Sequence, residues 1–384
     1  MRDAVIVEAV RTAIAKRGGA LAGVHPAPLS SAVLRALTAR SGISPTLIDD
    51  VVWGCVTQVG EQSLNIGRTA VLGAGWPESV PAVTIDRQCG SSQQAVQFAA
   101  SGVISGQYEF VVAGGVESMT RVPMLSSRQG EDPYGPEFSA RYGGTIPHQG
   151  AGAELIAERW SLNRSQLDEF SLESHAKAAA AQDAGLFERE TIGLTLADGA
   201  VFGRDEGVRR GSTLESLGGI RSAFTPNGLV TAGNSSQLSD AAAALLITTT
   251  ENAERHGLTP LARIRNSVAV GSDPIMMLTG PIAATQRVLE RAGLAISDIG
   301  VFEINEAFAS VPLAWGIETG ADLGLLNPRG GAVALGHPLG ASGARLMTTM
   351  LNHMRDNGIR YGLQSMCEGG GQANATILEL LSPT

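Results

Sequence analysis

The sequence predicts an α/β protein made of two similar units, with an irregular domain inserted in the first. Short apolar runs alternate with helix-length segments before residue 119 and after residue 238, and this alternation is typical of a sheet covered by helices. Between the two regions, residues 120–147 contain four prolines and four glycines. Both regular regions also repeat one order, in which a strand, a glycine-containing turn, a helix and a second strand follow each other. The repetition indicates two copies of one α/β unit.

Continuous apolar runs in the first region predict strands that are buried on both faces of a sheet. These strands are expected at residues 4–8, 51–56, 82–85 and 110–113, with helices at residues 29–41 and 90–105. Ser44 and Pro45 supply the N-cap and the first position of a further short helix.

Helical patterns follow the irregular stretch, and the regular alternation then returns. Helices are expected at residues 151–160 and 164–184, and the alternating segments are 238–250, 262–270, 285–292, 301–304 and 307–319, followed by a strand at 333–335, a helix at 343–356 and a strand at 363–366. We therefore predict an N-terminal domain of residues 1–118 plus 239–258, an inserted loop domain of residues 119–238, and a C-terminal domain of residues 259–384.

Charge and hydropathy exclude several classes of protein. The 384 residues carry a net charge of −9 without a long basic run, which is unfavourable for binding nucleic acid. The longest apolar stretches, such as residues 241–247, are far shorter than the roughly 20 residues that span a bilayer. Three widely spaced cysteines do not suggest a disulfide framework. We expect an enzyme of the cytoplasm that does not associate with membranes.

Cys89 is the first candidate for chemistry. It lies in residues 86–92, DRQCGSS, where a predicted strand gives way to a predicted helix. A thiol at a helix start lies near the positive end of the helix dipole and near free backbone N–H groups, which lower its pKa. Gly90 allows a sharp turn and leaves room for a substrate. A lone cysteine is also typical of a small buried thiol without chemistry, and the residues alone leave both interpretations open.

His337 and Cys367 also follow predicted strands. His337 lies in residues 336–343, GHPLGASG, and so much glycine and proline around an imidazole indicates that it faces a cleft. Cys367 begins the segment CEGGG. Its three glycines expose backbone N–H groups that could bind an oxyanion.

Polar residues near these turns allow other interpretations. Asn305 and Glu306 follow the apolar run at residues 301–304, where they could equally serve as the N-cap and first turn of a helix. Two cysteines and a histidine raise the question of zinc. No Cys-x-x-Cys pair or close histidine pair is present, so we expect no metal site and favour activated-thiol chemistry.

Taken together, these motifs resemble those of the thiolase family. The segments that carry the resemblance are the Cys89 turn, residues 113–119 (AGGVESM), 231–240 (TAGNSSQLSD) and 305–308 (NEAF), the Gly-His-Pro segment at His337 and the Cys-x-Gly segment at Cys367. They occur in the family's order from the first strand to the last. The fold implied is the thiolase one, in which two similar α/β domains form a five-layer αβαβα core with a loop domain inserted in the first.

The resemblance also implies a reaction and a set of catalytic residues. Cys89 resembles the nucleophile that takes the acyl group from a 3-oxoacyl-CoA, and His337 the base that accepts its proton. Cys367 resembles the acid/base that protonates the departing acetyl-CoA carbanion. Asn305 would position a water in one oxyanion hole with His337, and the backbone N–H groups of Cys89 and Gly369 would form the other.

Contacts to coenzyme A are implied by the same resemblance, with CoA as a substrate and no permanently bound cofactor. The matching positions are Arg209 near the adenine and phosphates, Ser216, which follows it at the family spacing, Ser236 near the pantetheine amide, Met277, Ala307 and Phe308 along the pantetheine, and His148, which matches a histidine of the acetoacetyl-CoA branch. Taken alone, Arg209 could be only a solvated loop charge. The expected partners are acyl-CoA, CoA and other copies of the chain, as a homodimer or homotetramer.

Departures from the acetoacetyl-CoA thiolases concern the choice of substrate. The segment from Met119 to His148 is shorter, while residues 53–62 (WGCVTQVGEQ) and 367–371 (CEGGG) look more like the degradative 3-ketoacyl-CoA branch of fatty-acid β-oxidation. Longer or bulkier 3-oxoacyl-CoA substrates are therefore expected, with acetoacetyl-CoA formation as the alternative. A condensing ketosynthase would carry histidine or asparagine in place of Cys367. A non-catalytic CoA- or lipid-binding relative would have lost Cys89, His337 or Cys367.

Overall fold

A large mixed sheet forms the frame of the protein, which is described here by a computed structural model covering residues 2–144 and 148–381. The strands follow the order β11-β12-β13-β10-β1-β9-β5-β3-β4 across the sheet. Their bounds are β1 Val5–Thr12, β3 Asp50–Gly54, β4 Val83–Ile85, β5 Phe110–Ser118, β9 Ser239–Thr248, β10 Ala262–Gly271, β11 Val301–Ile304, β12 Tyr361–Glu368 and β13 Gln372–Leu380. β2 (Ala15–Lys16) pairs with β9 beside this path.

The sheet consists of two halves with the same pairing order. In the first half β3 is parallel to β5, β5 is antiparallel to β9, and β9 is antiparallel to β1. In the second half β11 is parallel to β12, β12 is antiparallel to β13, and β13 is antiparallel to β10. The halves meet where β1 pairs antiparallel with β10, at Val5 and Ile6. The predicted repetition of one α/β unit is confirmed.

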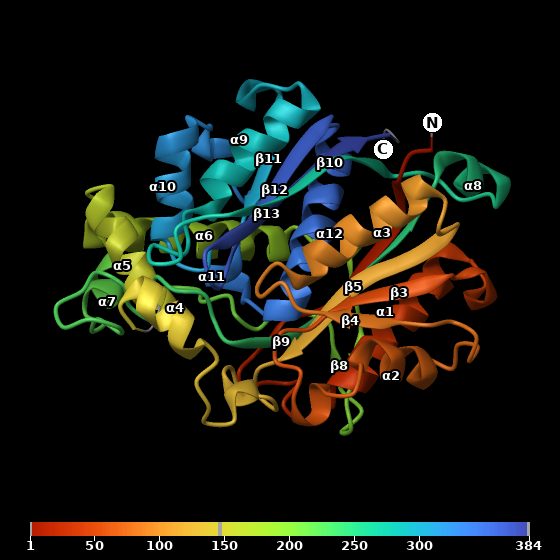
Figure 1. The fold of residues 1–384 in the computed structure, drawn as a ribbon, viewed down its shortest axis with the longest axis horizontal. Helices are drawn as coiled ribbons and strands as arrows, with labels where there is room; N and C mark the ends of the chain where they lie inside the picture. Colours follow the sequence, from red (N-terminus) through yellow and green to blue (C-terminus); the bar gives the residue numbers. More distant parts are fainter. Residues whose placement is uncertain (1, 145–147, 382–384) are drawn as a thin grey trace.

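Helices cover both halves and also fill the space between them (Figure 1). α1 (Pro26–Ser41) and α2 (Ile66–Gly73) pack on the first half, and α9 (Gly280–Ala292) and α10 (Ser310–Thr319) pack on the second. α3 (Ser91–Ser105) and α12 (Leu339–Asn357) form the middle layer, and their apolar side chains share one core with strands of both halves. These are the five αβαβα layers that the family resemblance implies.

The two central helices approach each other closely near their N-termini. A Cβ atom at Gly343 of α12 would lie 2.3 Å from the backbone nitrogen of Gln93 in α3, so only glycine fits there. Gln364 of β12 donates hydrogen bonds to Gln93 Oε1 (3.0 Å) and to the Gly343 carbonyl oxygen (2.8 Å). The turns before these helices, which carry Cys89 and His337, are thereby brought to the same part of the molecule.

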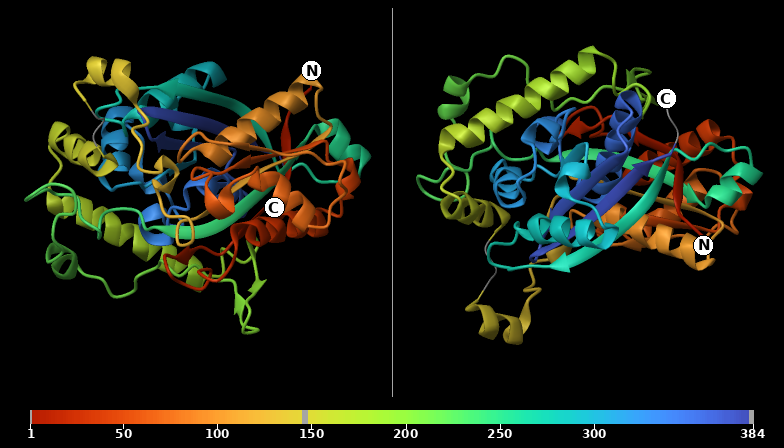
Figure 2. Two further views of the ribbon diagram at one scale, coloured as in Figure 1. Left: turned by 60° about the horizontal axis from the view of Figure 1, so that its bottom comes forward. Right: turned by 90° about the horizontal axis from the view of Figure 1, so that it is seen from above.

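Residues 119–238 connect β5 to β9 and contain mostly helices. These are α4 (Gly135–Tyr142), α5 (Gln149–Arg159), α6 (Arg164–Asp183) and α7 (Leu214–Gly218), with short strands β6 (Thr191–Ile192), β7 (Leu194–Thr195) and β8 (Val201–Phe202). α5 lies against α10 of the second unit, whereas α4 stands out from the body of the molecule (Figure 2). The side chain of Asn163 accepts a hydrogen bond from Gln166 N and caps α6.

Most predicted elements are present, with bounds that differ by a few residues. The predicted short helix is confirmed: the Ser44 side chain caps residues Pro45–Leu47. The strand expected at residues 333–335 is wrong, because Ala332–Leu335 forms a single helical turn, α11, between Gly331 and Gly336. All four α11 side chains are buried, and the period of so short an apolar run does not distinguish strand from helix.

Four α-helices among the described residues were not expected from the pattern: α2, α4, α7 and α8 (Thr250–Arg255). None of the helices in residues 2–144 and 148–381 combines the length and the apolar character that crossing a membrane requires.

Candidate active site

Cys89 lies in a tight turn between β4 and α3. Gln88 has a φ of 48°, in the left-handed region that a non-glycine residue seldom adopts. The turn is held by hydrogen bonds from Gln88 N to Asp86 Oδ1 (2.6 Å) and from Ser91 Oγ to the Gln88 carbonyl oxygen (2.6 Å). Gly90 is the N-cap of α3, so Cys89 precedes the helix by one position more than the sequence suggests.

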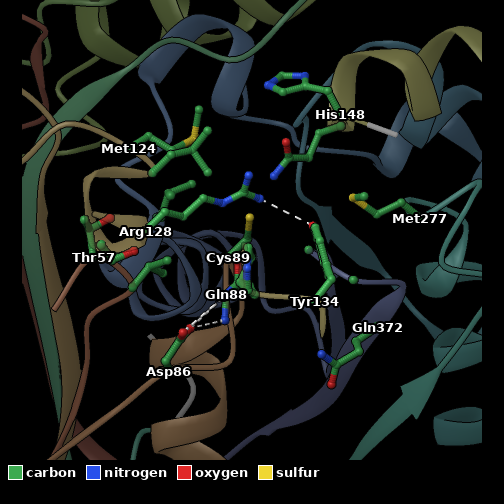
Figure 3. Close-up of a pocket in the computed structure, with 18 residues that line it drawn as sticks. Thr57, Asp86, Gln88, Cys89, Met124, Arg128, Tyr134, His148, Met277 and Gln372 are labelled. Carbon is green, nitrogen blue, oxygen red and sulfur yellow. Dashed lines mark hydrogen bonds between the residues drawn. The ribbon is translucent and has the colours of Figure 1, made fainter. Parts of the chain in front are cut away.

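The Cys89 sulfur points into a cavity of about 480 Å³ (Figure 3). Burial raises the pKa of the Cys89 thiol well above its ordinary value, and the nearby Cys367 and Glu368 add to that rise. The expectation of a lowered pKa is therefore wrong for the free protein, because loss of solvation and the neighbouring Cys367 and Glu368 outweigh the one backbone hydrogen bond that lowers it. Cys89 rests as a thiol and needs a base before it can attack.

His337 follows α11 and lies directly before α12. Gly336 has a φ of 110°, and a Cβ atom there would lie 2.2 Å from Ser239 Oγ, so only glycine allows this turn. His337 Nδ1 lies 2.6 Å from Ser342 Oγ. Because the Ser342 hydroxyl donates its one hydrogen to the Pro338 carbonyl oxygen (2.8 Å), its oxygen must accept from Nδ1–H. Nε2 of His337 therefore carries the lone pair of the ring, which faces the Asn305 amide.

That lone pair makes His337 a proton acceptor. Burial, with the charge of Arg345, lowers the pKa of His337 to about 3, so the imidazole is neutral near pH 7. Asn305, just after β11, places Nδ2 at 3.4 Å from His337 Nε2. Asn305 Oδ1 is buried without a hydrogen-bond partner among the described residues. The pair thus offers one base and one unsatisfied amide oxygen.

Cys367 lies near the end of β12, opposite Ala373 of β13. Burial raises its pKa to about 12, so it also rests as a thiol. Asn305 N donates to the Ser365 carbonyl oxygen (3.1 Å), which places Asn305 beside the strand that carries Cys367. Cys89 and Cys367 therefore form one pair of nearby thiols, and His337 and Asn305 form a second pair on adjoining elements.

The cavity lining contains Cys89, Gly369, His148 and Met277 from the predicted set. It also contains residues that the sequence pattern did not single out: Val56, Thr57, Asp86, Gln88, Met124, Leu125, Ser127, Arg128, Pro133, Tyr134, Gln149, Leu339, Gly370 and Gln372. Six of these lie within residues 124–134. An irregular loop has no period from which the direction of a side chain could be predicted.

The candidate CoA contacts fall into two groups. Ala307, Phe308 and Met277 share one apolar cluster with Cys367. Phe224 contacts Phe308 edge-on, with ring centroids 5.7 Å apart, and stacks on His148 at 5.3 Å. These residues form an apolar wall that continues from the cavity.

The remaining candidates lie outside the cavity lining. Ser236 N donates to the Ala307 carbonyl oxygen (2.9 Å), which fixes Ser236 beside the apolar wall. Ser216 Oγ accepts a hydrogen bond from Thr213 N (2.9 Å), which completes a capping box on α7. Arg209 is exposed, and its backbone N–H donates to His175 Nδ1 (3.1 Å). Ser216 thus has a structural role in the capping box, in which Thr213 is the N-cap.

In residues 2–144 and 148–381, no group of three or more His, Cys, Asp or Glu side chains is arranged to bind a metal ion.

Comparison with known proteins defines the class. Residues 4–251 match the family described as "Thiolase, N-terminal domain", and residues 258–380 match "Thiolase, C-terminal domain". The chain belongs to the thiolase family, whose members are acyltransferases.

Individual relatives cover nearly the whole chain. The steroid 3-ketoacyl-CoA thiolase FadA6 of Mycobacterium tuberculosis is 48% identical over 99% of this chain and 95% of its own length. The 3-ketoacyl-CoA thiolase of Escherichia coli O139:H28 is 44% identical over 99% of this chain and 100% of its own. The crystal structure of the Bacillus anthracis acetyl-CoA acetyltransferase superposes with a TM-score of 0.91 at 37% identity, covering 99% of both chains.

Proposed function

We propose that this thiolase cleaves 3-oxoacyl-CoA with CoA, giving acetyl-CoA and a shortened acyl-CoA through an acyl thioester on Cys89. The carrying observation is the Cys89 thiol in a cavity, with Cys367 close enough to raise its pKa. The turn that carries His337 leads into α12, which packs on α3 directly after Cys89. The names of the FadA6 and Escherichia coli relatives support the degradative direction.

In the first half-reaction, Cys89 attacks the 3-oxo carbon while His337 Nε2 takes the thiol proton. The bond between C2 and C3 breaks, the acyl group stays on Cys89, and the electron pair goes to the acetyl-CoA carbanion. Cys367 protonates that carbanion and becomes a thiolate. The raised pKa of Cys367, about 12, supports this role, because an acid must still hold its proton near pH 7.

In the second half-reaction, the Cys367 thiolate removes the proton of an incoming CoA thiol. The CoA sulfur takes the acyl group from Cys89, and His337 returns its proton to Cys89. Both cysteines and the histidine regain their starting states. Asn305 and His337 form one proposed oxyanion hole, for which the unpartnered Asn305 Oδ1 leaves an acceptor to orient a water. The backbone N–H groups of Cys89 and Gly369 form the other.

Mass spectrometry of the acylated enzyme tests the assignment of the nucleophile. After incubation with acyl-CoA, one acyl mass is expected on the peptide that contains Cys89 and none on a Cys89→Ala variant. Iodoacetamide should alkylate Cys89 faster than Cys55, which is fully buried. Because burial raises the Cys89 pKa, the alkylation rate should still rise with pH above the ordinary thiol value of about 8.5. Labelling of Cys55 instead would refute the assignment.

Formation of acetoacetyl-CoA from two acetyl-CoA is the second candidate reaction, and the Bacillus anthracis acetyltransferase favours it. A comparison of initial rates over 3-oxoacyl-CoAs of varied length and branching separates the two. A non-catalytic CoA-binding protein would form no acyl-enzyme at all.

The expected organisation of the chain is part of the proposal. We assign residues 1–118 plus 239–258 to the N-terminal domain, 119–238 to an inserted CoA-binding domain and 259–384 to the C-terminal domain. The adjacent positions of β5 and β9 in the sheet support an insertion between them. A homodimer or homotetramer is supported by edge strand β4 and helix α3, where Val83 and Phe98 are 43% and 50% exposed. The cytoplasmic location is likewise a proposal.

A further inference from the structure

The cavity that holds Cys89 has a positive charge on its wall. Arg128 ends a short helical turn, Ser126–Arg128, in the loop that follows β5. In Figure 3 its guanidinium lies above the Cys89 sulfur, between Met124 and Tyr134, while His148 and Met277 line another side. Of the residues that line this cavity, Arg128 is the one with a permanent positive charge.

The guanidinium has no carboxylate partner. No Asp or Glu oxygen lies within 4.0 Å of its nitrogens in the described part of the chain, although Glu131 and Asp132 follow closely in sequence. Its neighbour is Tyr134, whose hydroxyl oxygen accepts a hydrogen bond from Nη2 (3.4 Å) and whose ring centroid lies 5.7 Å from the guanidinium carbon. The contact with Tyr134 orients the guanidinium without neutralising its charge. Most of the N–H donors of Arg128 therefore remain free for a ligand.

The base of the loop is held firmly. Thr120 Oγ1 donates to Asp240 Oδ2 (2.5 Å), and Arg121 forms a two-pronged ion pair with Glu61. The other charged residue of the cavity, Asp86, accepts hydrogen bonds from Gln88 N and Nε2 and lies on the opposite side of Cys89 in Figure 3. A negative group on a substrate would therefore meet Arg128 on one side of the cavity.

We propose that Arg128 selects 3-oxoacyl-CoA thioesters whose acyl group carries a carboxylate at its far end. This inference rests on the proposed thiolase function and names the class of its substrate. The guanidinium fork matches a carboxylate with two parallel hydrogen bonds. A purely hydrocarbon tail offers the guanidinium no hydrogen-bond acceptor at all.

A matched pair of substrates tests the proposal. 3-Oxoadipyl-CoA and 3-oxohexanoyl-CoA have the same six-carbon chain and the same CoA, and they end in a carboxylate and a methyl group respectively. We expect the wild-type kcat/KM for thiolysis to favour 3-oxoadipyl-CoA by about 10- to 100-fold, the effect of a charge-assisted pair. In Arg128→Gln this ratio should fall towards one, and Arg128→Lys should keep part of it.

Arg141 provides the control. It is a second arginine near the same loop, over the Tyr142 ring at 5.3 Å, and it does not line the cavity. Arg141→Gln should leave the substrate ratio unchanged. A wild-type enzyme without preference for the carboxylate overturns the proposal. An equal fall in kcat/KM for both substrates in Arg128→Gln also overturns it. Arg128 would then bind the phosphates of CoA or stabilise the loop. Failure of the proposed thiolase function would look different, since neither substrate would be cleaved.

Discussion

Cys367 and Cys89 rest as thiols in one site, yet their surroundings suit them to different steps. Cys89 opens onto the cavity, whereas Cys367 is buried at the end of β12. If Cys367 is the second base, Cys367→Ala should still form the acyl-enzyme on Cys89 and lose both cleavage and condensation. A positioned acid/base contributes about 10²- to 10⁴-fold, so the loss should be of that size. Deuterium exchange at the methyl group of acetyl-CoA measures the proton step directly, and it should disappear.

The control for this variant is the acyl-enzyme itself, with circular dichroism to show an intact fold. Cys89→Ala should show the reverse pattern at the first step, with no acyl-enzyme. Normal methyl exchange in folded Cys367→Ala would remove Cys367 from the mechanism and make it a core cysteine.

Some residues of the site could be identified from the sequence, and others could not. Cys89, His337 and Cys367 stand out because each lies in a glycine-rich turn, and such turns are places where side chains reach a cavity. Arg128 and Tyr134 do not stand out, because their positions depend on the path of an irregular loop. The resting pKa of Cys89 was wrongly expected, because it depends on burial and on the charges of groups distant in sequence, such as Glu368.

At the scale of the elements, strands buried on both faces could be predicted well. Residues 301–304 were expected as part of the regular alternation and form β11 with the same bounds. α11 could not be predicted, since four apolar residues fit a strand and a helical turn equally. The packing of one element on another could not be predicted either. The contact of α3 with α12 depends on Gly343, whose role appears only when Gln93 lies opposite.

That contact gives a prediction about elements. Gly343→Ala should force α12 away from α3, because the new methyl would meet the Gln93 backbone nitrogen at 2.3 Å. Overpacking of this kind costs about 1–3 kcal/mol, measurable as a lower urea midpoint. Thiolysis should fall as well, since both helices begin at the site. Gly218→Ala in α7 is the control: nothing lies within 4 Å of its added Cβ, so stability should hold. Equal stability of the two variants would contradict a tight contact.

At the scale of the whole molecule, Arg11 ties residues 119–238 to the sheet. This arginine of β1 is fully buried. Its Nε lies 2.6 Å from Glu190 Oε1, and its Nη1 lies 2.8 Å from Asp205 Oδ1. Glu190 also accepts a hydrogen bond from Thr349 Oγ1 of α12 (2.8 Å), so the cluster joins three parts of the chain.

Arg11→Met should leave buried Asp205 without its counter-charge and Glu190 with only the more distant Arg329 (3.9 Å), and it should destabilise the protein by about 3–5 kcal/mol. The physical reason is desolvation, because both carboxylates lose their main charged partner while staying away from water. Chemical denaturation measures the change. Asp205→Asn added to Arg11→Met should recover part of the loss, because one uncompensated charge is removed. Arg255→Met, in an exposed pair with Glu251, should change little, since surface pairs contribute little. If Arg11→Met unfolds at the wild-type midpoint, the buried cluster does not hold residues 119–238 to the sheet.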